Sequence, residues 1–233
     1  MAVRRARRVE ASVPRLALEV LSSAEPVAGV AGPGRWLVIR YCPTALFSLK
    51  MSSATSTVGK SLLIPTMYTV KMALLDAALR RHDRAVAEEL ISVLRHADLR
   101  IGPPERAVVT HTIVKVRQEP KQPKPEMPYG SAVAFREFVA YSGDLRIAFD
   151  LATLTEGCAK LIETLCPCIN YFGKRGSLMQ FSGMERLVQL DQTFTQSVSL
   201  MDLSVPSLAH IAHLDDFGPD ANLDVLDSYS KEK

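Results

Sequence analysis

Apolar residues recur in two different spacings along the first half of this chain, and each spacing predicts a type of element. The segment 36–41 is rich in aromatic and β-branched residues, which is typical of a strand. Between Thr66 and Arg81 the apolar residues fall on one face of a helix, and Pro65 suits its first turn. A shorter helical pattern covers 84–94. We therefore expect a strand followed by a long helix with a short helical elaboration.

The second half of the folded region repeats these patterns. A Gly-Pro-Pro break at 102–104 precedes residues 108–116, which alternate between two faces as a strand does. Residues 135–150 are extended with a turn or bulge in the middle, 155–165 have helical spacing, and 178–181 are extended again. The order of strand, helix, strand, strand, helix, strand predicts an α+β fold of the ferredoxin-like (RRM-like) βαββαβ type. Its four-stranded sheet would be antiparallel, with the helices on one face.

The ends of the chain do not continue this pattern. Residues 1–34 start with a basic run and then become rich in Pro and Gly, so we expect an N-terminal arm. The main domain is expected to cover 35–190. Residues 191–233 end in an acidic stretch with few large apolar side chains, which predicts a peripheral C-terminal extension.

The composition sets few further limits. Hydrophobic residues make up 47% of the chain and charged residues 23%, which is an ordinary balance for a globular domain with a core. The formal net charge is only +3, so binding to a nucleic acid depends on local clusters of Lys and Arg. No apolar stretch approaches the roughly 18–20 residues that span a bilayer, and no signal core follows the basic start. We expect a cytoplasmic protein without membrane contact.

The sequence does not predict a metal or cofactor site. A single residue stands between Cys166 and Cys168, whereas about two to four residues usually stand between the paired cysteines of a structural zinc site. We expect buried, reduced thiols. His210 and His213, followed by two Asp residues, would make metal ligands only on a helix, and we expect them to be exposed.

Two glycines bracket two adjacent cations in the segment 171–177. The glycines let the backbone approach another chain closely, while Lys174 and Arg175 offer contacts to phosphate. Ser177 and exposed backbone N–H groups can add hydrogen bonds, and Tyr171 and Phe172 can stack on bases. A solvated turn with two surface charges is the alternative. The candidate RNA-binding residues of this segment are Tyr171, Gly173, Lys174, Arg175, Gly176 and Ser177.

A second polar loop carries a possible phosphate-binding motif. Residues 54–61 fit the loosest form of the P-loop, with Ala in place of the first Gly. Pro65 opposes this interpretation, because it would lie inside the helix that starts at the Gly-Lys-Ser of a true P-loop. We expect a loop whose Lys60 and Ser61 contact RNA phosphate, and a P-loop nucleotide-binding protein remains an alternative.

The segment 119–130 contains four prolines and no apolar period, so it is neither a helix nor an interior strand. We expect a projecting loop or irregular hairpin that inserts into a nucleic acid or a neighbouring subunit, with a disordered surface loop as the alternative. Its candidate contact residues are Lys121, Lys124, Met127 and Tyr129.

A catalytic alternative rests on one strand. His111 and Lys115 lie four residues apart and therefore share a face, and Tyr41 or Tyr141 can be imagined beside them. Such groups can serve a metal-free ribonuclease as acid, base and phosphate stabiliser. Their proximity does not follow from the sequence, so we expect a protein without catalytic residues. A pure protein-interaction module is a further alternative.

In their order, these pieces resemble the CRISPR-associated protein 5 family over roughly residues 35–185. The first strand leads through a polar loop to the segment 59–66 and a long helix. Phe-Arg-Glu-Phe at 135–138 opens a strand after a projecting loop, like the family's Arg-Glu-aromatic strand. The segment 170–177 follows the second helix, as the family's glycine-containing loop does.

The resemblance implies a non-catalytic subunit of a Cascade-like CRISPR surveillance complex, which acts in antiviral defence. Such a subunit holds the 5′ handle of the CRISPR RNA (crRNA) and caps the backbone subunits, with the large subunit nearby and the target DNA contacted indirectly. It also implies a thumb, here 119–134, that contacts the backbone subunits and the guide. One branch of the family cleaves the precursor RNA, so a metal-independent endoribonuclease is the alternative that the resemblance leaves open.

Overall fold

The main sheet of the protein has four antiparallel strands. The computed structural model describes residues 34–51, 54, 58–118, 129–197 and 211–226. The strands of the main sheet are β1 (Trp36–Pro43), β3 (Leu99–Gly102), β6 (Leu145–Asp150) and β7 (Met179–Leu187). They are ordered β3-β6-β1-β7, and each neighbouring pair is antiparallel. The protein is therefore a mixed α+β protein, as the sequence predicts.

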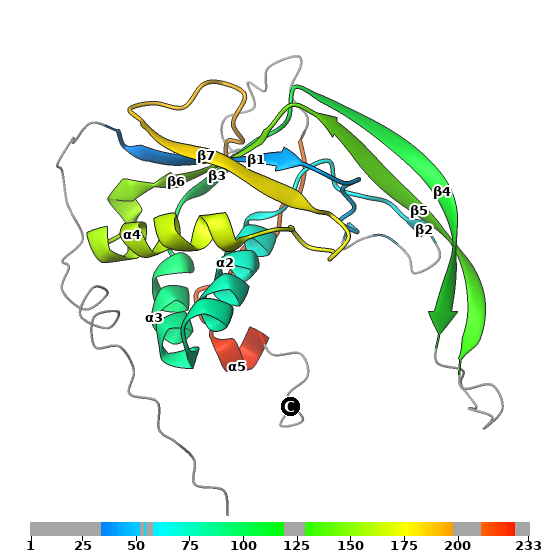
Figure 1. Cartoon of the computed structure of the whole chain (residues 1–233), viewed down its shortest axis with the longest axis horizontal. Helices are drawn as coiled ribbons and strands as arrows, with labels where there is room; N and C mark the ends of the chain where they lie inside the picture. The colour runs from blue at the N-terminus through cyan, green and yellow to red at the C-terminus, as the bar shows by residue number, and fades with distance from the viewer. Residues whose placement is uncertain (1–33, 52–53, 55–57, 119–128, 198–210, 227–233) are drawn as a thin grey trace, which may run out of the picture.

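The helices cover one face of this sheet (Figure 1). They are α2 (Met67–Arg81), α3 (Arg84–Leu94), α4 (Glu156–Leu165) and the short α5 (Leu223–Leu226), with 3-10 turns η1 (Leu151–Thr153) and η2 (Cys166–Cys168). Each long helix begins with a side-chain cap. Thr66 accepts from the backbone N–H of Thr69, and Thr155 accepts from that of Cys158. These caps place the helix starts where the sequence predicts them.

The core lies between the helices and the sheet. Strand β1 alternates, so Leu37, Ile39 and Tyr41 face the helices while Val38 packs in a smaller cluster on the opposite face. Burial of each large apolar side chain stabilises the fold by about 1.5–3 kcal/mol. Burial also raises the pKa of the Cys158 and Cys166 thiols to about 12, so both stay neutral and unreactive near neutral pH.

Two predicted strands of the main sheet belong elsewhere. A second sheet consists of β2 (Val58–Gly59), β4 (Arg106–Gln118) and β5 (Gly130–Ser142), in the order β2-β5-β4. The prediction that 108–116 and the first half of 135–150 belong to the main sheet is therefore wrong. Strand β3 takes the place of 108–116, and the second half of 135–150 forms β6 in the main sheet. Alternation alone misleads here, because the side chains of β4 are exposed or half-buried on both faces. Strand β3 has only four residues and ends at the glycine of the Gly-Pro-Pro break, so the break at 102–104 is the only signal visible there.

The strands β4 and β5 form a long hairpin that curves away from the main body (Figure 1). Their antiparallel register runs from Arg106↔Ser142 to Gln118↔Gly130. Gly143, with a φ of +94°, makes the bend from which the chain enters β6. The described part of the projection is thus the hairpin of β4 and β5, and residues 119–128, expected to form a loop or an irregular hairpin, lie outside the described part of the chain.

A C-terminal segment, residues 215–217, packs against helix α2. The backbone N–H of Tyr68 donates to the carbonyl of Asp215 at 2.9 Å, and the Tyr68 ring meets the Phe217 ring edge to face. The ammonium of Lys71 is fully buried and lies 2.7 Å from a carboxylate oxygen of Asp216. The predicted peripheral extension therefore includes a segment that supplies a charge partner to the interior.

None of the helices that the structure describes combines the length and apolar composition needed to cross a membrane.

Candidate nucleic-acid interface

The two polar loops singled out in the sequence meet at the base of the hairpin. Phe47 pairs with Val139 of β5 through two backbone hydrogen bonds of 2.7 and 2.8 Å. Lys50 forms an isolated antiparallel β-bridge with Ser61, so the two ends of the loop after β1 lie side by side. The segment 171–178 joins them through its contacts with residues 48 and 49. We call the segments 44–51, 58–62 and 171–178 the loop cluster.

Ser177 is the hydrogen-bonded link between the two loops. Its hydroxyl accepts from the backbone N–H of Ser48 at 3.0 Å and donates to the Ser48 carbonyl. The Ser48 hydroxyl in turn donates to the carbonyl of Glu137 in β5. Because the Ser177 side chain is fully buried, the prediction that its hydroxyl contacts RNA is wrong. Its role is to hold the two loops against the hairpin.

Ser61 is also a structural residue. Its hydroxyl accepts from the Leu49 N–H at 3.0 Å and donates to the Leu62 carbonyl, while its own N–H donates to the Glu137 carboxylate at 2.9 Å. These bonds occupy the hydroxyl and the backbone N–H of Ser61, so the prediction that Ser61 contacts RNA phosphate is wrong as well. The P-loop alternative also fails, because the helix begins at Met67 rather than at the Gly-Lys-Ser of the motif.

The two glycines of the second loop have different surroundings. Gly173 has a φ of +72°, a backbone conformation that favours glycine, and a Cβ there would lie 2.9 Å from the end of the Leu49 side chain. Gly176 is exposed and has open space where a Cβ would point. Phe172 is fully buried in the core, which overturns the prediction that it stacks on bases, whereas Tyr171 remains half-buried.

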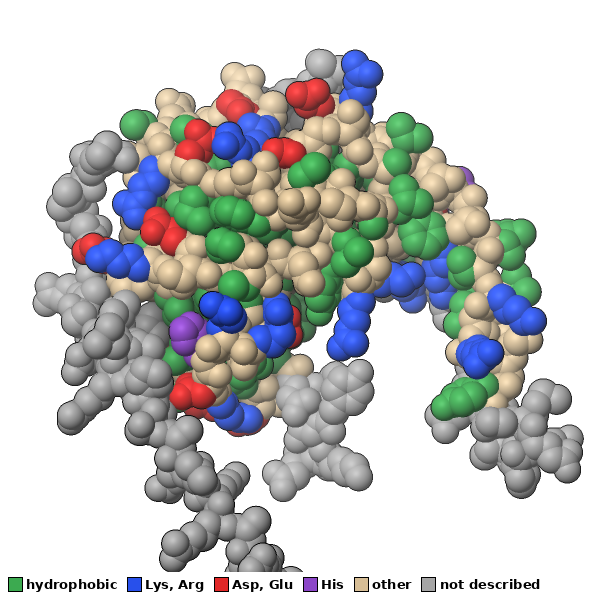
Figure 2. Space-filling model, in the orientation of Figure 1, with side chains coloured by type: hydrophobic (Ala, Val, Ile, Leu, Met, Phe, Trp, Pro, Cys, Tyr) green, Lys and Arg blue, Asp and Glu red, His purple; other side chains and the backbone are tan. Residues whose placement is uncertain are grey.

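The cations of the loop cluster are exposed. Lys174 Nζ lies 5.3 Å from the centre of the Phe138 ring in β5, a cation–π contact that ties the loop to the hairpin. Arg175 and Lys60 are exposed, and so is Lys50, which the sequence reasoning missed. The backbone pairing of Lys50 with Ser61 is a long-range feature that no local motif signals. Figure 2 shows Lys and Arg side chains gathered between the main body and the hairpin.

The remaining predicted contact residues lie on the projection. Tyr129, just before β5, is 60% exposed. Lys121, Lys124 and Met127 lie outside the described residues, so their contacts remain predictions.

The groups proposed for catalysis do not assemble. His111 and Lys115 lie four residues apart on β4, so their Cα atoms are about 13 Å apart, and the His111 ring lies 3.5 Å from the Glu137 carboxylate. The Tyr41 hydroxyl is buried and donates to the carbonyl of Cys166. The Tyr141 hydroxyl donates to the carbonyl of Leu63, and burial raises its pKa. The expected partners of a ribonuclease site are thus used elsewhere in the fold.

Within the described ranges no three His, Cys, Asp or Glu side chains are grouped so that they could hold a metal ion. His213 is exposed, as expected, and His210 lies outside the described residues.

The fold and the loop cluster define a mixed α+β protein with antiparallel sheets and a basic surface at the base of a hairpin. No family model matches the chain. The chain is similar to CRISPR-associated protein Cas5 from Archaeoglobus fulgidus, with 24% identity over 140 residues. This match covers 60% of the chain and 57% of the relative, so the chain spans little more than half the length of the relative it matches. The predicted resemblance is confirmed.

Solved structures give more distant similarities. One is a structure of the Type III-B Cmr-beta bound to cognate target RNA, with 11% identity, a TM-score of 0.46, and coverage of 66% of this chain and 60% of the other. Another is a CRISPR RNA-guided surveillance complex, with 14% identity, a TM-score of 0.40, and coverage of 61% and 59%.

Proposed function

We propose that this chain is a non-catalytic, cytoplasmic subunit of a CRISPR RNA-guided surveillance complex, resembling Cas5. It binds the 5′ handle of the crRNA at the loop cluster and caps the backbone assembly. The observation that carries this proposal is the sequence similarity to Cas5. The loop cluster supports it, because two loops from distant parts of the sequence bring exposed cations together beside the hairpin.

The finer fold assignment is part of the proposal. We assign β1, α2 with α3, β3, β6, α4 and β7 to the six elements of a ferredoxin-like domain. The antiparallel order β3-β6-β1-β7 and the single helical layer support this assignment. The β4–β5 hairpin is then an insertion between the second and third strands.

In this proposal, phosphates of the handle are held by Lys60, Lys174 and Arg175. Lysine and arginine contacts to phosphate fix the position and direction of the strand but carry little sequence information. The exposed backbone around Gly176 can approach the RNA closely, and Tyr171 offers a ring for stacking. Lys174 is already positioned by its contact with Phe138, so less side-chain freedom is lost when RNA binds.

The hairpin is the proposed thumb that contacts the backbone subunits and the guide. Ile113 and Phe135 are cross-strand partners and are 64% and 49% exposed. Val133, next but one to Phe135 on the same face, is also exposed. Neighbouring apolar side chains that stay in water mark a surface for another protein. The large subunit and, indirectly, the target DNA are further proposed partners.

The proposal can be tested by co-expressing the tagged chain with its backbone subunits and a CRISPR array. We expect a complex whose RNA molecules share one repeat-derived 5′ end. Replacing Ile113 and Phe135 by Ser should reduce recovery of the backbone subunits about tenfold, because apolar interface residues are lost. Ile211→Ser, which changes an exposed apolar residue outside the hairpin, serves as the control.

Recovery of the chain without backbone subunits, or with RNA of random 5′ ends, would contradict the proposal. Equal recovery of the backbone subunits with the hairpin variant and with the Ile211→Ser control would show that the hairpin does not contact them.

A further inference from the structure

The face of the main sheet that carries no helices has a pocket at one end. Val38 and Ala148 point to this face, and Phe194 packs on both of them. Gly102 makes room for the ring, since a Cβ there would lie 3.0 Å from Phe194 Cε1. Thr195 fixes the segment to β3, because its N–H donates to the Ile101 carbonyl at 2.8 Å and its hydroxyl accepts from the Ile101 N–H. The segment after β7 is therefore part of this face.

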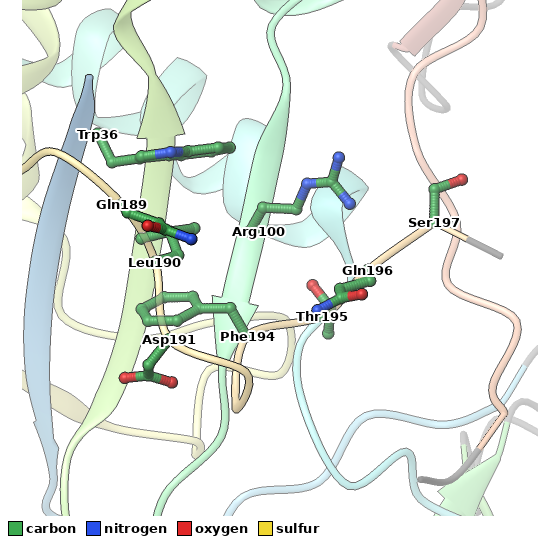
Figure 3. A pocket seen from close by; sticks show the side chains of 9 residues that line it. All are labelled: Trp36, Arg100, Gln189, Leu190, Asp191, Phe194, Thr195, Gln196 and Ser197. Atoms are coloured by element: carbon green, nitrogen blue, oxygen red, sulfur yellow. The ribbon is translucent and has the colours of Figure 1, made fainter. Parts of the chain in front are cut away.

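The pocket has a volume of about 400 Å³, within the range of about 300–1,000 Å³ of small-molecule sites. The Trp36 ring is half-buried at the pocket, whereas Phe194 is only 4% exposed, and in Figure 3 Gln189 and Leu190 lie between the two rings. The guanidinium of Arg100, which also donates to Asp98 at 2.9 Å, and the side-chain amide of Gln196 lie on the polar side. An accessible aromatic ring, a cation and an amide suit a flat aromatic ligand that carries an anionic group.

Both aromatic rings are held in place by arginines. The Arg146 guanidinium lies 4.6 Å from the centre of the Phe194 ring and donates to Asp191 at 2.9 Å. Arg35 lies 5.5 Å from the Trp36 ring centre and pairs with the buried Asp150. The carboxylate of Asp191, although it lines the pocket, is thus balanced by a cation.

We propose that this pocket binds one unpaired nucleotide of a single-stranded RNA, with the base against the half-buried Trp36 and the phosphate at Arg100. The inference extends the proposed function, because it adds a second RNA contact to the one at the loop cluster. The two sites are separate. Trp36 begins β1 and Pro43 ends it, so the strand alone sets them about 24 Å apart. Stacking on aromatic side chains of a sheet is a general way in which proteins hold unpaired bases.

The chain carries its own probe, because Trp36 is its only tryptophan. A short oligoadenylate and adenosine monophosphate are titrated into the full chain while the tryptophan fluorescence is recorded. We expect saturable quenching, with the oligonucleotide binding about tenfold more tightly than the mononucleotide because its further phosphates add contacts. Arg100→Gln should weaken the oligonucleotide about tenfold, by loss of a charge-assisted contact.

Arg40→Gln is the matched control, because Arg40 lies on the same sheet face, pairs with Glu185 and does not line the pocket. It should leave the affinity unchanged, and thermal unfolding checks that both variants fold. Absence of quenching, or an equal loss of affinity in both variants, would show that this pocket does not bind the nucleotide. Equal affinity for the mononucleotide would overturn RNA as the ligand.

The Lys174→Ala, Arg175→Ala variant separates this inference from the proposed function. Quenching that persists in this variant supports an independent site. Quenching that disappears with it would mean that the signal arises from the loop cluster, which would overturn the inference.

Discussion

Replacing Asp216 by Asn is expected to lower the free energy of unfolding by about 3 kcal/mol, because it leaves the ammonium of Lys71 without a charged partner inside the protein. The Lys71 side chain has 0% exposure, whereas that of Asp216 is 42% exposed. The cost therefore falls on the lysine, which cannot recover its hydration without opening the contact between the C-terminal segment and α2. Urea denaturation followed by circular dichroism measures the change.

A matched control is available on the same helix. Asp76 pairs with Arg80 at 3.0 Å, and both side chains are about half exposed. Asp76→Asn should change the free energy of unfolding by less than about 0.5 kcal/mol, as surface pairs one helical turn apart usually do. The double variant Lys71→Met, Asp216→Asn should regain most of the lost stability, because the buried charge is gone. Equal effects of Asp216→Asn and Asp76→Asn would show that Lys71 does not depend on its partner.

The second large effect is expected for RNA affinity. Replacing Lys174 and Arg175 by Ala should weaken binding of the handle RNA about thirtyfold at low salt, or about 2 kcal/mol, through the loss of two charge-assisted contacts. The slope of log affinity against log salt should fall by about 1.4, since each neutralised phosphate of a single strand contributes about 0.7. Filter binding or fluorescence anisotropy over a series of salt concentrations measures both quantities.

The control for this variant removes the same charge at a different place. Arg84 and Lys160 are exposed on α3 and α4, where each pairs with a carboxylate on the same helix. Replacing both by Ala should leave the affinity within about twofold, because distant charges are screened by salt. Similar weakening by the two double variants would indicate general attraction between RNA and a basic protein, and the loop cluster would lose its special role.

The helix starts could be predicted because their signals are local. Thr66 and Thr155 each stand three residues before the N–H that their side chain caps, a relation visible in the sequence. The strands were harder. Apolar and polar residues alternate along β4 as they do in a strand of the core. A hairpin that projects into solvent has the same alternation, so only the burial of the side chains distinguishes the two cases. Strand β3 has four residues and ends at Gly102, so its pattern is too short to stand out.

The candidate interface was predicted in part for a similar reason. Lys174 and Arg175 are exposed, and glycine at position 173 is favoured by its φ, both of which agree with the loop predicted from the sequence. Ser61 and Ser177 bond to the backbone of distant residues, which a sequence motif cannot reveal. A serine beside a cation suits a phosphate site and a buried loop junction equally well.

The central claim is that this chain recognises the 5′ handle of a crRNA and leaves it intact. Its most direct test compares binding of the purified chain to the repeat-derived handle RNA and to a scrambled RNA of the same composition, at several salt concentrations. We expect tighter binding of the handle RNA than of the scrambled RNA at every salt concentration, with full-length RNA recovered afterwards. Equal affinity for the two RNAs would contradict handle recognition, and recovery of a cleaved handle would contradict the non-catalytic assignment.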